Sequence, residues 1–178
     1  NPDTGSPKER ERGILRLMSG TVAWFSGLSG SGKTSIAERT SEILRQDGQR
    51  VTILDGDVVR NKEHRHLGFT TEDIKENNRL IAIMCLQTLS EYDVILVPII
   101  SPFRESREAA KQTLGKAFAE VYVRASLEEV MRRDPKGHYQ KIRECVLQGF
   151  IGVDNGLPYE PPLAPDIVLD TERFNMEE

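Results

Sequence analysis

The stretch TVAWFSGLSGSGKTS, residues 21–35, joins a short apolar segment to a run of glycine and serine. Residues 21–25 are predicted to form a buried strand, and residues 33–48 a helix with apolar side chains at helical spacing. Between them, residues 27–34 fit the pattern of a phosphate-binding loop (P-loop), G-x4-G-K-S/T. Glycine suits such a loop because backbone N–H groups must curl around phosphate oxygens in conformations that side chains obstruct.

The P-loop residues have distinct predicted roles. Lys33 reaches the β and γ phosphates of a nucleotide, Thr34 offers its hydroxyl to Mg²⁺, and the following helix directs its positive end at the anion. The alternative is a chance match, but the strand before and the helix after are the context that the motif requires. We therefore expect these residues to bind nucleotide phosphate: Gly27, Leu28, Ser29, Gly30, Ser31, Gly32, Lys33 and Thr34.

Strand-like and helix-like segments alternate along the rest of the chain. Further strands are expected at residues 51–55, 94–100, 117–123 and 166–170. Helices are expected from Thr70 or Thr71 to about residue 90, after SPFR at 101–104, and up to Arg133 behind a capping box of Ser126 and Glu129. This alternation predicts an α/β fold, a three-layer sandwich of the P-loop NTPase type with a parallel, doubly wound sheet.

The predicted domain plan is simple. Residues 1–20 form a polar leader or linker, and residues 21–178 form one kinase-sized domain in which residues 134–165 act as a mobile lid. A net charge of −4 argues against a broad nucleic-acid surface, and the longest apolar run, VILVPII, is too short to cross a membrane. The two cysteines show no CxxC spacing and no signal peptide is visible, so we expect a cytoplasmic protein without disulfides.

Charged residues follow the second and third predicted strands. Because ligands bind at the carboxyl ends of parallel strands, these segments should meet the P-loop at one edge of the sheet. Asp55 and Asp57 of the DGD segment can hold Mg²⁺ through water, or orient and deprotonate an acceptor hydroxyl. The alternative is an acidic turn in which Gly56 supplies a positive φ. Arg60 follows closely enough to bind an anionic substrate.

Three further groups of side chains each have a predicted role. Arg104 and Arg107 oppose the dipole at a helix start, which fits anion binding, although a solvated helix start is the alternative. Arg133 and Lys136 place cations on the predicted lid, where they would approach a transferring phosphoryl group unless the lid is merely a basic surface loop. The three histidines have no metal-ligand spacing, so we expect surface or supporting roles for His64, His66 and His138.

The chain resembles the adenylyl-sulfate kinase (APS kinase) family. The matching pieces are GLSGSGKT, LDGDVVR, LGFTTEDIKEN, ISPFRESR, RDPKGHYQK, YEPP and LDT, in the family's order. The resemblance implies transfer of a phosphoryl group from ATP, with Mg²⁺, to the ribose 3′-hydroxyl of adenylyl sulfate (APS), giving 3′-phosphoadenylyl sulfate (PAPS) for sulfate assimilation. It also implies a homodimer, and a chain that is fused to ATP sulfurylase or works with it.

The resemblance also implies roles for individual residues. Asp57 would lie near the acceptor hydroxyl, Asp55 and Thr34 near Mg²⁺, and Arg60 at the phosphosulfate end of APS. Phe69 and Phe150 would stack on the adenine. Further substrate contacts are implied for Asn77, the backbone of Ile100, Ser101 and Lys136, and an ATP contact for Arg133. The implied catalytic set is Lys33, Asp55, Asp57, Ser101 and Lys136; Ser101 matches a serine that some members phosphorylate.

The chain departs from the family pattern at Ile74, where the family usually has an arginine of the substrate pocket. We expect Ile74→Arg to improve the use of APS if the pocket is otherwise intact. Two other functions stay open. The chain is either a related kinase for another nucleotide-like acceptor, or a catalytically weak nucleotide-binding regulatory domain of a larger sulfate-activating enzyme.

Overall fold

The computed structural model describes residues 20–134, 137, 140, 151–152 and 157–173. In this part of the chain, five parallel strands form one sheet in the order β2-β3-β1-β4-β5, which confirms the predicted α/β fold with a doubly wound parallel sheet. The strands are β1 (Thr21–Ser26), β2 (Val51–Ile53), β3 (Val94–Pro98), β4 (Phe118–Arg124) and β5 (Ile167–Asp170).

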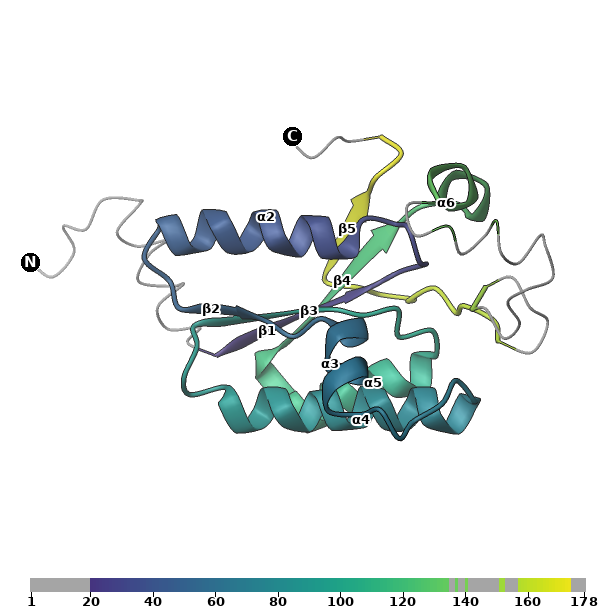
Figure 1. The fold of residues 1–178 in the computed structure, drawn as a ribbon. Coiled ribbons are helices and arrows are strands. Elements are labelled where there is room, and N and C mark those ends of the chain that lie inside the picture. Colours follow the sequence, from purple (N-terminus) through teal and green to yellow (C-terminus); the bar gives the residue numbers. More distant parts are fainter. Residues whose placement is uncertain (1–19, 135–136, 138–139, 141–150, 153–156, 174–178) are drawn as a thin grey trace, which may run out of the picture.

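Helices cover both faces of this sheet (Figure 1). Helix α2 lies on one face, and helices α3, α4 and α5 lie on the other, so the fold has three layers as expected. None of the helices that the structure describes is both long and apolar enough to span a bilayer. The helices are α2 (Lys33–Gln46), α3 (Gly56–Lys62), α4 (Thr71–Thr88), α5 (Arg104–Leu114), the 3-10 helix η1 (Gly115–Ala117) and α6 (Leu127–Arg133).

The central strands are apolar on both faces, and alternate residues serve the two layers. On β1, Trp24 belongs to the buried cluster beneath α4 and α5, whereas Phe25 belongs to the cluster beneath α2. On β3, Val97 belongs to the cluster beneath α4 and α5, and Leu96 to the cluster beneath α2. This pattern is what an internal parallel strand requires, because side chains at successive positions point to opposite faces. The cores therefore fix the strand register, and with it the positions of the loops at the carboxyl edge.

The structure corrects the predicted end of the second strand and excludes the alternative of an acidic turn with a positive φ at Gly56. Strand β2 ends at Ile53 rather than Asp55, because Asp55 caps α3, a helix that the sequence did not suggest. Its carboxylate accepts hydrogen bonds from the backbone N–H groups of Asp57 (2.9 Å) and Val58 (3.2 Å). Gly56 is needed for packing rather than for a positive φ, since a Cβ there would lie 2.7 Å from Ile99 Cγ1.

Two predicted helix starts can be compared with the structure. Helix α4 begins at Thr71, within the predicted range, and the side chains of Thr70 and Asp73 form a complete capping box there. At α6, Ser126 accepts from the backbone of Glu129 (3.2 Å), but the reciprocal bond is missing. The Glu172 carboxylate accepts the hydrogen bond from the backbone N–H of Ser126 instead. The Glu129 carboxylate accepts hydrogen bonds from Arg132 and Arg133 within α6.

Candidate nucleotide-binding site

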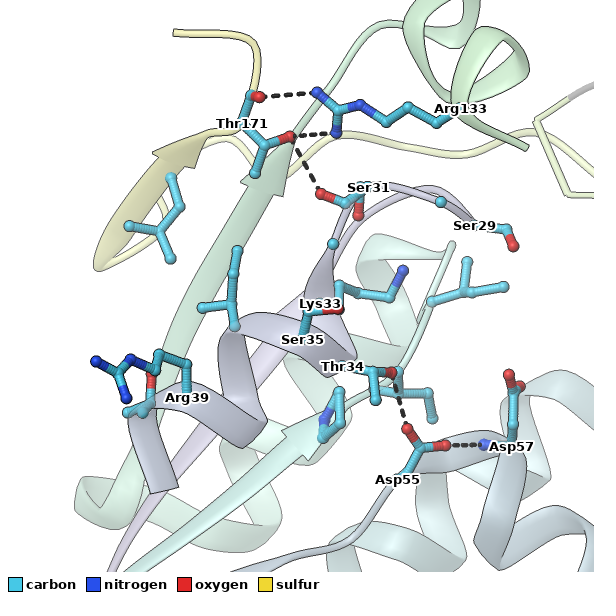
Figure 2. Close-up of a pocket in the computed structure, with 18 of the residues that line it drawn as sticks. Ser29, Ser31, Lys33, Thr34, Ser35, Arg39, Asp55, Asp57, Arg133 and Thr171 are labelled. Atoms are coloured by element: carbon cyan, nitrogen blue, oxygen red, sulfur yellow. Dashed lines mark hydrogen bonds between the residues drawn. The ribbon is translucent and has the colours of Figure 1, made fainter. Parts of the chain in front are cut away.

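A pocket of about 860 Å³ opens at the carboxyl edge of the sheet, where the P-loop, the start of α3, the end of β3, α6 and the end of β5 meet (Figure 2). The structure brings together here most of the residues predicted to bind the nucleotide. Lining residues from the predicted site are Ser29, Gly30, Ser31, Gly32, Lys33, Thr34, Asp55, Asp57, Ile100 and Arg133.

The P-loop has the backbone geometry that its glycines predict. Gly27, Gly30 and Gly32 all have positive φ, at 151°, 81° and 102°. A Cβ on Gly27 would lie only 2.4 Å from the carbonyl oxygen of Val123, so the loop passes too close to β4 for any side chain. Lys33 donates from Nζ to the carbonyl oxygens at the start of the loop, Gly27 (2.9 Å) and Leu28 (2.7 Å), and is 8% exposed. The lysine is thereby held across the cradle.

Thr34 and Asp55 are hydrogen-bonded at the predicted metal site. Thr34 Oγ1 donates to Asp55 Oδ2 at 2.9 Å, while Oδ1 of the same carboxylate caps α3. Figure 2 shows this pair beside Asp57 and below Lys33. Hydroxyl and carboxylate oxygens suit Mg²⁺, which keeps several waters and bridges to phosphate oxygens. Among the residues described, no cluster of three or more His, Cys, Asp or Glu side chains could replace this arrangement as a metal site.

Arg133 is tied to the opposite wall of the pocket through Thr171. It donates to Thr171 Oγ1 (2.9 Å) and to the Thr171 carbonyl (2.7 Å), and Thr171 Oγ1 donates in turn to the Ser31 carbonyl at 3.1 Å. These contacts connect α6 and the end of β5 to the P-loop, as Figure 2 shows. The LDT motif gives no sign of this role for Thr171, because nothing local to the motif indicates contacts with residues 38 and 140 positions away.

Glu129 orients Arg133 from within α6. Its carboxylate accepts from Arg132 Nη2 and from Arg133 Nε, both at 2.7 Å. These hydrogen bonds, first from Arg132 and then from Arg133, lower the pKa of Glu129 from its usual 4.5 to about 2. The carboxylate is therefore charged at any physiological pH and keeps Arg133 turned toward Thr171.

Arg60 and Phe69, which are both predicted to bind the acceptor, contact each other. The Arg60 guanidinium carbon is 4.7 Å from the centre of the Phe69 ring, and Nη1 donates to the Gly68 carbonyl. Burial lowers the pKa of Arg60, opposed by the charges of Asp57 and Asp73. The Phe69 ring itself is 69% exposed, which leaves a flat aromatic face available for stacking. Two predicted partners, Lys136 and Phe150, lie outside the described residues.

Asn77 and Ser101 are buried on the same side of the sheet as α4 and α5. Asn77 is 3% exposed, and its Oδ1 lies 2.8 Å from His64 Nδ1. Ser101 is 1% exposed and has a strained positive φ of 46°, which is uncommon for a residue with a Cβ. Its Oγ has no hydrogen-bond partner among the described residues. The Ile100 carbonyl is shared with the P-loop, since it accepts from the Gly27 N–H at 3.4 Å.

The prediction that Arg107 binds an anion was wrong, whereas the same prediction for the exposed Arg104 stays a prediction. Arg107 is 3% exposed and forms an ion pair with Glu120 at 2.8 Å. It also donates to the carbonyl oxygens of Ser101 and Glu160, both at 2.6 Å. Arg104 donates from Nε to the Pro161 carbonyl at 2.8 Å. Both arginines therefore hold the YEPP segment and the loop after β3 in place, through contacts with residues 53 and 57 positions along the chain.

Ile74 lies in a small apolar cluster rather than in an open polar pocket. It is 3% exposed and packs with Phe103 and Leu157, with Ile151 against the cluster. The neighbouring Lys75 points elsewhere, because its Nζ pairs with Glu105 at 2.6 Å. Arg79, one turn further along α4, pairs with Glu76 at 2.7 Å.

Comparisons with known proteins identify the family. A family model described as adenylylsulphate kinase matches residues 19–170. The chain belongs to the adenylyl-sulfate kinase family. It is 42% identical over 159 residues to the adenylyl-sulfate kinase of Picosynechococcus sp., covering 89% of this chain and 88% of that protein.

Two further relatives add context to this membership. The APS kinase CysC of Mycobacterium tuberculosis, solved in complex with AMPPNP and APS, is 37% identical, with a TM-score of 0.83 and coverage of 88% of this chain and 91% of that one. The bifunctional enzyme NodQ of Azospirillum brasilense is 45% identical over 162 residues, which are 90% of this chain but 26% of that protein. The family therefore includes chains of this length and longer proteins that contain a similar region.

Proposed function

We propose that this adenylyl-sulfate kinase family member transfers the γ-phosphoryl group of ATP to the ribose 3′-hydroxyl of APS, giving ADP and PAPS. The observation that carries the proposal is the pocket in which Lys33, the Thr34–Asp55 pair and Asp57 meet at one edge of the sheet. The curated adenylyl-sulfate kinases at 42% identity, and the related structure with AMPPNP and APS, support this chemistry.

On the donor side, the proposal assigns the nucleotide phosphates to the P-loop backbone and Lys33. Lys33 exchanges its present carbonyl contacts for phosphate oxygens and neutralises charge that develops during transfer. Thr34 and Asp55 would hold Mg²⁺, and this ion would supply further charge neutralisation. Arg133, fixed by Glu129 and Thr171, contacts the nucleotide at the far end of the pocket.

On the acceptor side, the proposal assigns orientation of the 3′-hydroxyl to Asp57, which lines the pocket next to Asp55. A positioned carboxylate can accept the hydroxyl proton as the bond to phosphorus forms. Arg60 contacts the phosphosulfate end, and the exposed Phe69 ring stacks on the adenine. Asn77, Ile100, Ser101, Lys136 and Phe150 complete the proposed set.

A coupled assay of ADP release tests this function. The protein is incubated with MgATP, with and without APS, and PAPS is identified as the second product. We expect release of ADP that depends on APS and on Mg²⁺. Tight ATP binding with no turnover for any acceptor would instead favour the regulatory-domain alternative.

A second candidate function is that of a kinase for another nucleotide-like acceptor. The observation that favours this candidate is the burial of Ile74 in an apolar cluster. An arginine that would pair with an anionic acceptor is replaced here by an apolar contact. Comparing kcat/KM for APS with values for other adenylates and for cytidine and uridine analogues separates the two. A tenfold preference for a different acceptor, the effect of about 1.4 kcal/mol, would favour the alternative.

We also propose a cytoplasmic homodimer, which is fused to ATP sulfurylase or works with it. The bifunctional NodQ, of which the match covers 26%, supports the idea that regions of this kind occur within longer proteins. Light scattering at several protein concentrations tests the dimer, and a monomer at all of them would contradict it.

A further inference from the structure

We propose that His64 is a positioning residue for the acceptor: it fixes the side-chain amide of Asn77 so that the Nδ2–H groups face the bound substrate. This inference rests on the proposed function, in which Asn77 contacts APS. His64 was expected from sequence to be a surface or supporting residue, and the structure makes the supporting role specific.

The contact joins two elements that surround the acceptor side. His64 follows α3, which carries Arg60, and Asn77 lies in the second turn of α4. Both side chains are buried, at 6% and 3% exposure, and the distance between His64 Nδ1 and Asn77 Oδ1 is 2.8 Å. A buried hydrogen bond of this length favours one orientation of the amide, because turning the amide over would place Nδ2 against Nδ1 and require the other imidazole tautomer.

The atoms in contact determine what Asn77 presents to a ligand. Because an amide oxygen only accepts, this contact is a hydrogen bond when the imidazole carries its proton on Nδ1. Asn77 Nδ2, with two N–H donors, then lies on the other side of the amide, and no hydrogen bond from it to a described residue is found. Nδ2 is not among the buried side-chain atoms that lack a hydrogen-bond partner, so it reaches solvent, and a ligand that binds there can accept from it. A nucleotide acceptor offers hydrogen-bond acceptors such as ring nitrogens, ribose hydroxyls and phosphate oxygens.

The chain offers a matched control two residues away. His66 is exposed, and its ring lies 6.4 Å from that of His64, edge to face. Its side chain makes no hydrogen bond with a described residue, so replacing it changes the local charge and aromatic content without touching Asn77. An effect of His64 on Asn77 should therefore be absent from variants of His66.

Four variants test the proposal through the KM for APS. His64→Leu removes the donor and should raise this KM about tenfold, the effect of one hydrogen bond, with kcat and the KM for ATP nearly unchanged. His64→Asn places an amide nitrogen where Nδ1 lies and should restore wild-type KM. His64→Gln moves its amide one bond further out, near the position of Nε2, and should not. His66→Asn should behave as wild type.

A double-mutant comparison separates positioning from general packing. If His64 acts through Asn77, His64→Leu adds no further rise in KM for APS when Asn77 is already alanine. Additive effects, or an equal rise in KM for both substrates, would overturn the proposal, as would a wild-type KM for APS in His64→Leu. Should His64→Leu fail to fold, the Asn and Gln variants decide the matter, and equal KM values for these two would overturn it.

Failure of the proposed function would be seen separately. Wild-type protein without APS-dependent ADP release contradicts the kinase assignment itself. The His64 proposal is contradicted when wild type is active and the His64 variants do not differ in their use of APS.

Discussion

The proposed donor and acceptor sites are built in different ways. The centre of the donor site is one continuous motif, residues 27–34, whose shape comes from backbone conformation and whose cation, Lys33, is bonded within the motif; Asp55 and Arg133 are added to it from other elements. The acceptor side is assembled from side chains on α3, the segment before α4, α4 itself and the loop after β3. Its defining contacts are pairs such as Arg60 with Phe69 and His64 with Asn77.

Because of this difference, substitutions on the donor side and on the acceptor side should have different effects on activity. Backbone shape depends on a few glycines and survives most substitutions nearby, so the donor side can be shared by kinases with different acceptors. Side-chain pairs can be exchanged one at a time, and each exchange alters which acceptor fits. We therefore expect donor-side variants to lose activity with every acceptor, whereas acceptor-side variants should change the preference among acceptors.

The largest expected effect is on the donor side. Lys33→Met removes the cation that lies across the P-loop, and we expect kcat to fall by about 10³-fold, or about 4 kcal/mol of transition-state stabilisation. Steady-state assays with APS and with any alternative acceptor should show the same loss. Lys111→Met, at an exposed position on α5, is the control and should leave kcat unchanged. A loss confined to one acceptor would contradict the division between the two sides.

The next largest effect concerns Ile74. Because Ile74 is buried with Phe103 and Leu157, Ile74→Arg should lower the free energy of unfolding by about 3 kcal/mol, whereas Ile74→Leu should cost less than about 1.5 kcal/mol. Denaturant titration of both variants measures this. The resemblance alone predicts better use of APS by Ile74→Arg. Wild-type stability together with a lower KM for APS would show that the guanidinium reaches the acceptor rather than the cluster.

A smaller effect is expected where the donor side depends on a distant residue. Thr171→Val removes the hydroxyl that accepts from Arg133 and donates to the Ser31 carbonyl. The KM for ATP should rise about fivefold, corresponding to about 1 kcal/mol, while the KM for APS stays constant. Thr171→Ser keeps the hydroxyl and should match wild type. An equal change in both KM values would mean that Thr171 supports the whole pocket.

The smallest effect is a pH dependence at Glu129. Its folded-state pKa of about 2 lies below the usual 4.5, so its charge stabilises the fold fully above pH 4.5. That contribution is lost as pH falls from about 4.5 through 2. Melting temperatures of wild type and Glu129→Gln should therefore differ slightly at pH 7 and converge toward pH 2. A difference that is constant across this range would contradict a role for the charge.

Much of the fold was predictable because its signals are local. The strand before the P-loop, the helix after it and the Thr70 cap depend on residues close together in the sequence. Helix α3 was missed because DGD suggests a turn, and only the Asp55 cap and the fit of Gly56 against Ile99 explain why a helix begins there. Family membership is now established, whereas the individual site residues stay predictions.

By itself, the sequence determined that a nucleotide phosphate site lies after the first strand of a parallel sheet, because glycine spacing and strand–helix alternation act over a few residues. Only the tertiary structure decided that Arg107 is a buried structural cation, that Thr171 connects Arg133 to the P-loop, and that His64 meets Asn77. The physical reason is that buried charges and hydrogen-bond donors are satisfied by whichever partners the fold brings near, and those partners can lie anywhere along the chain.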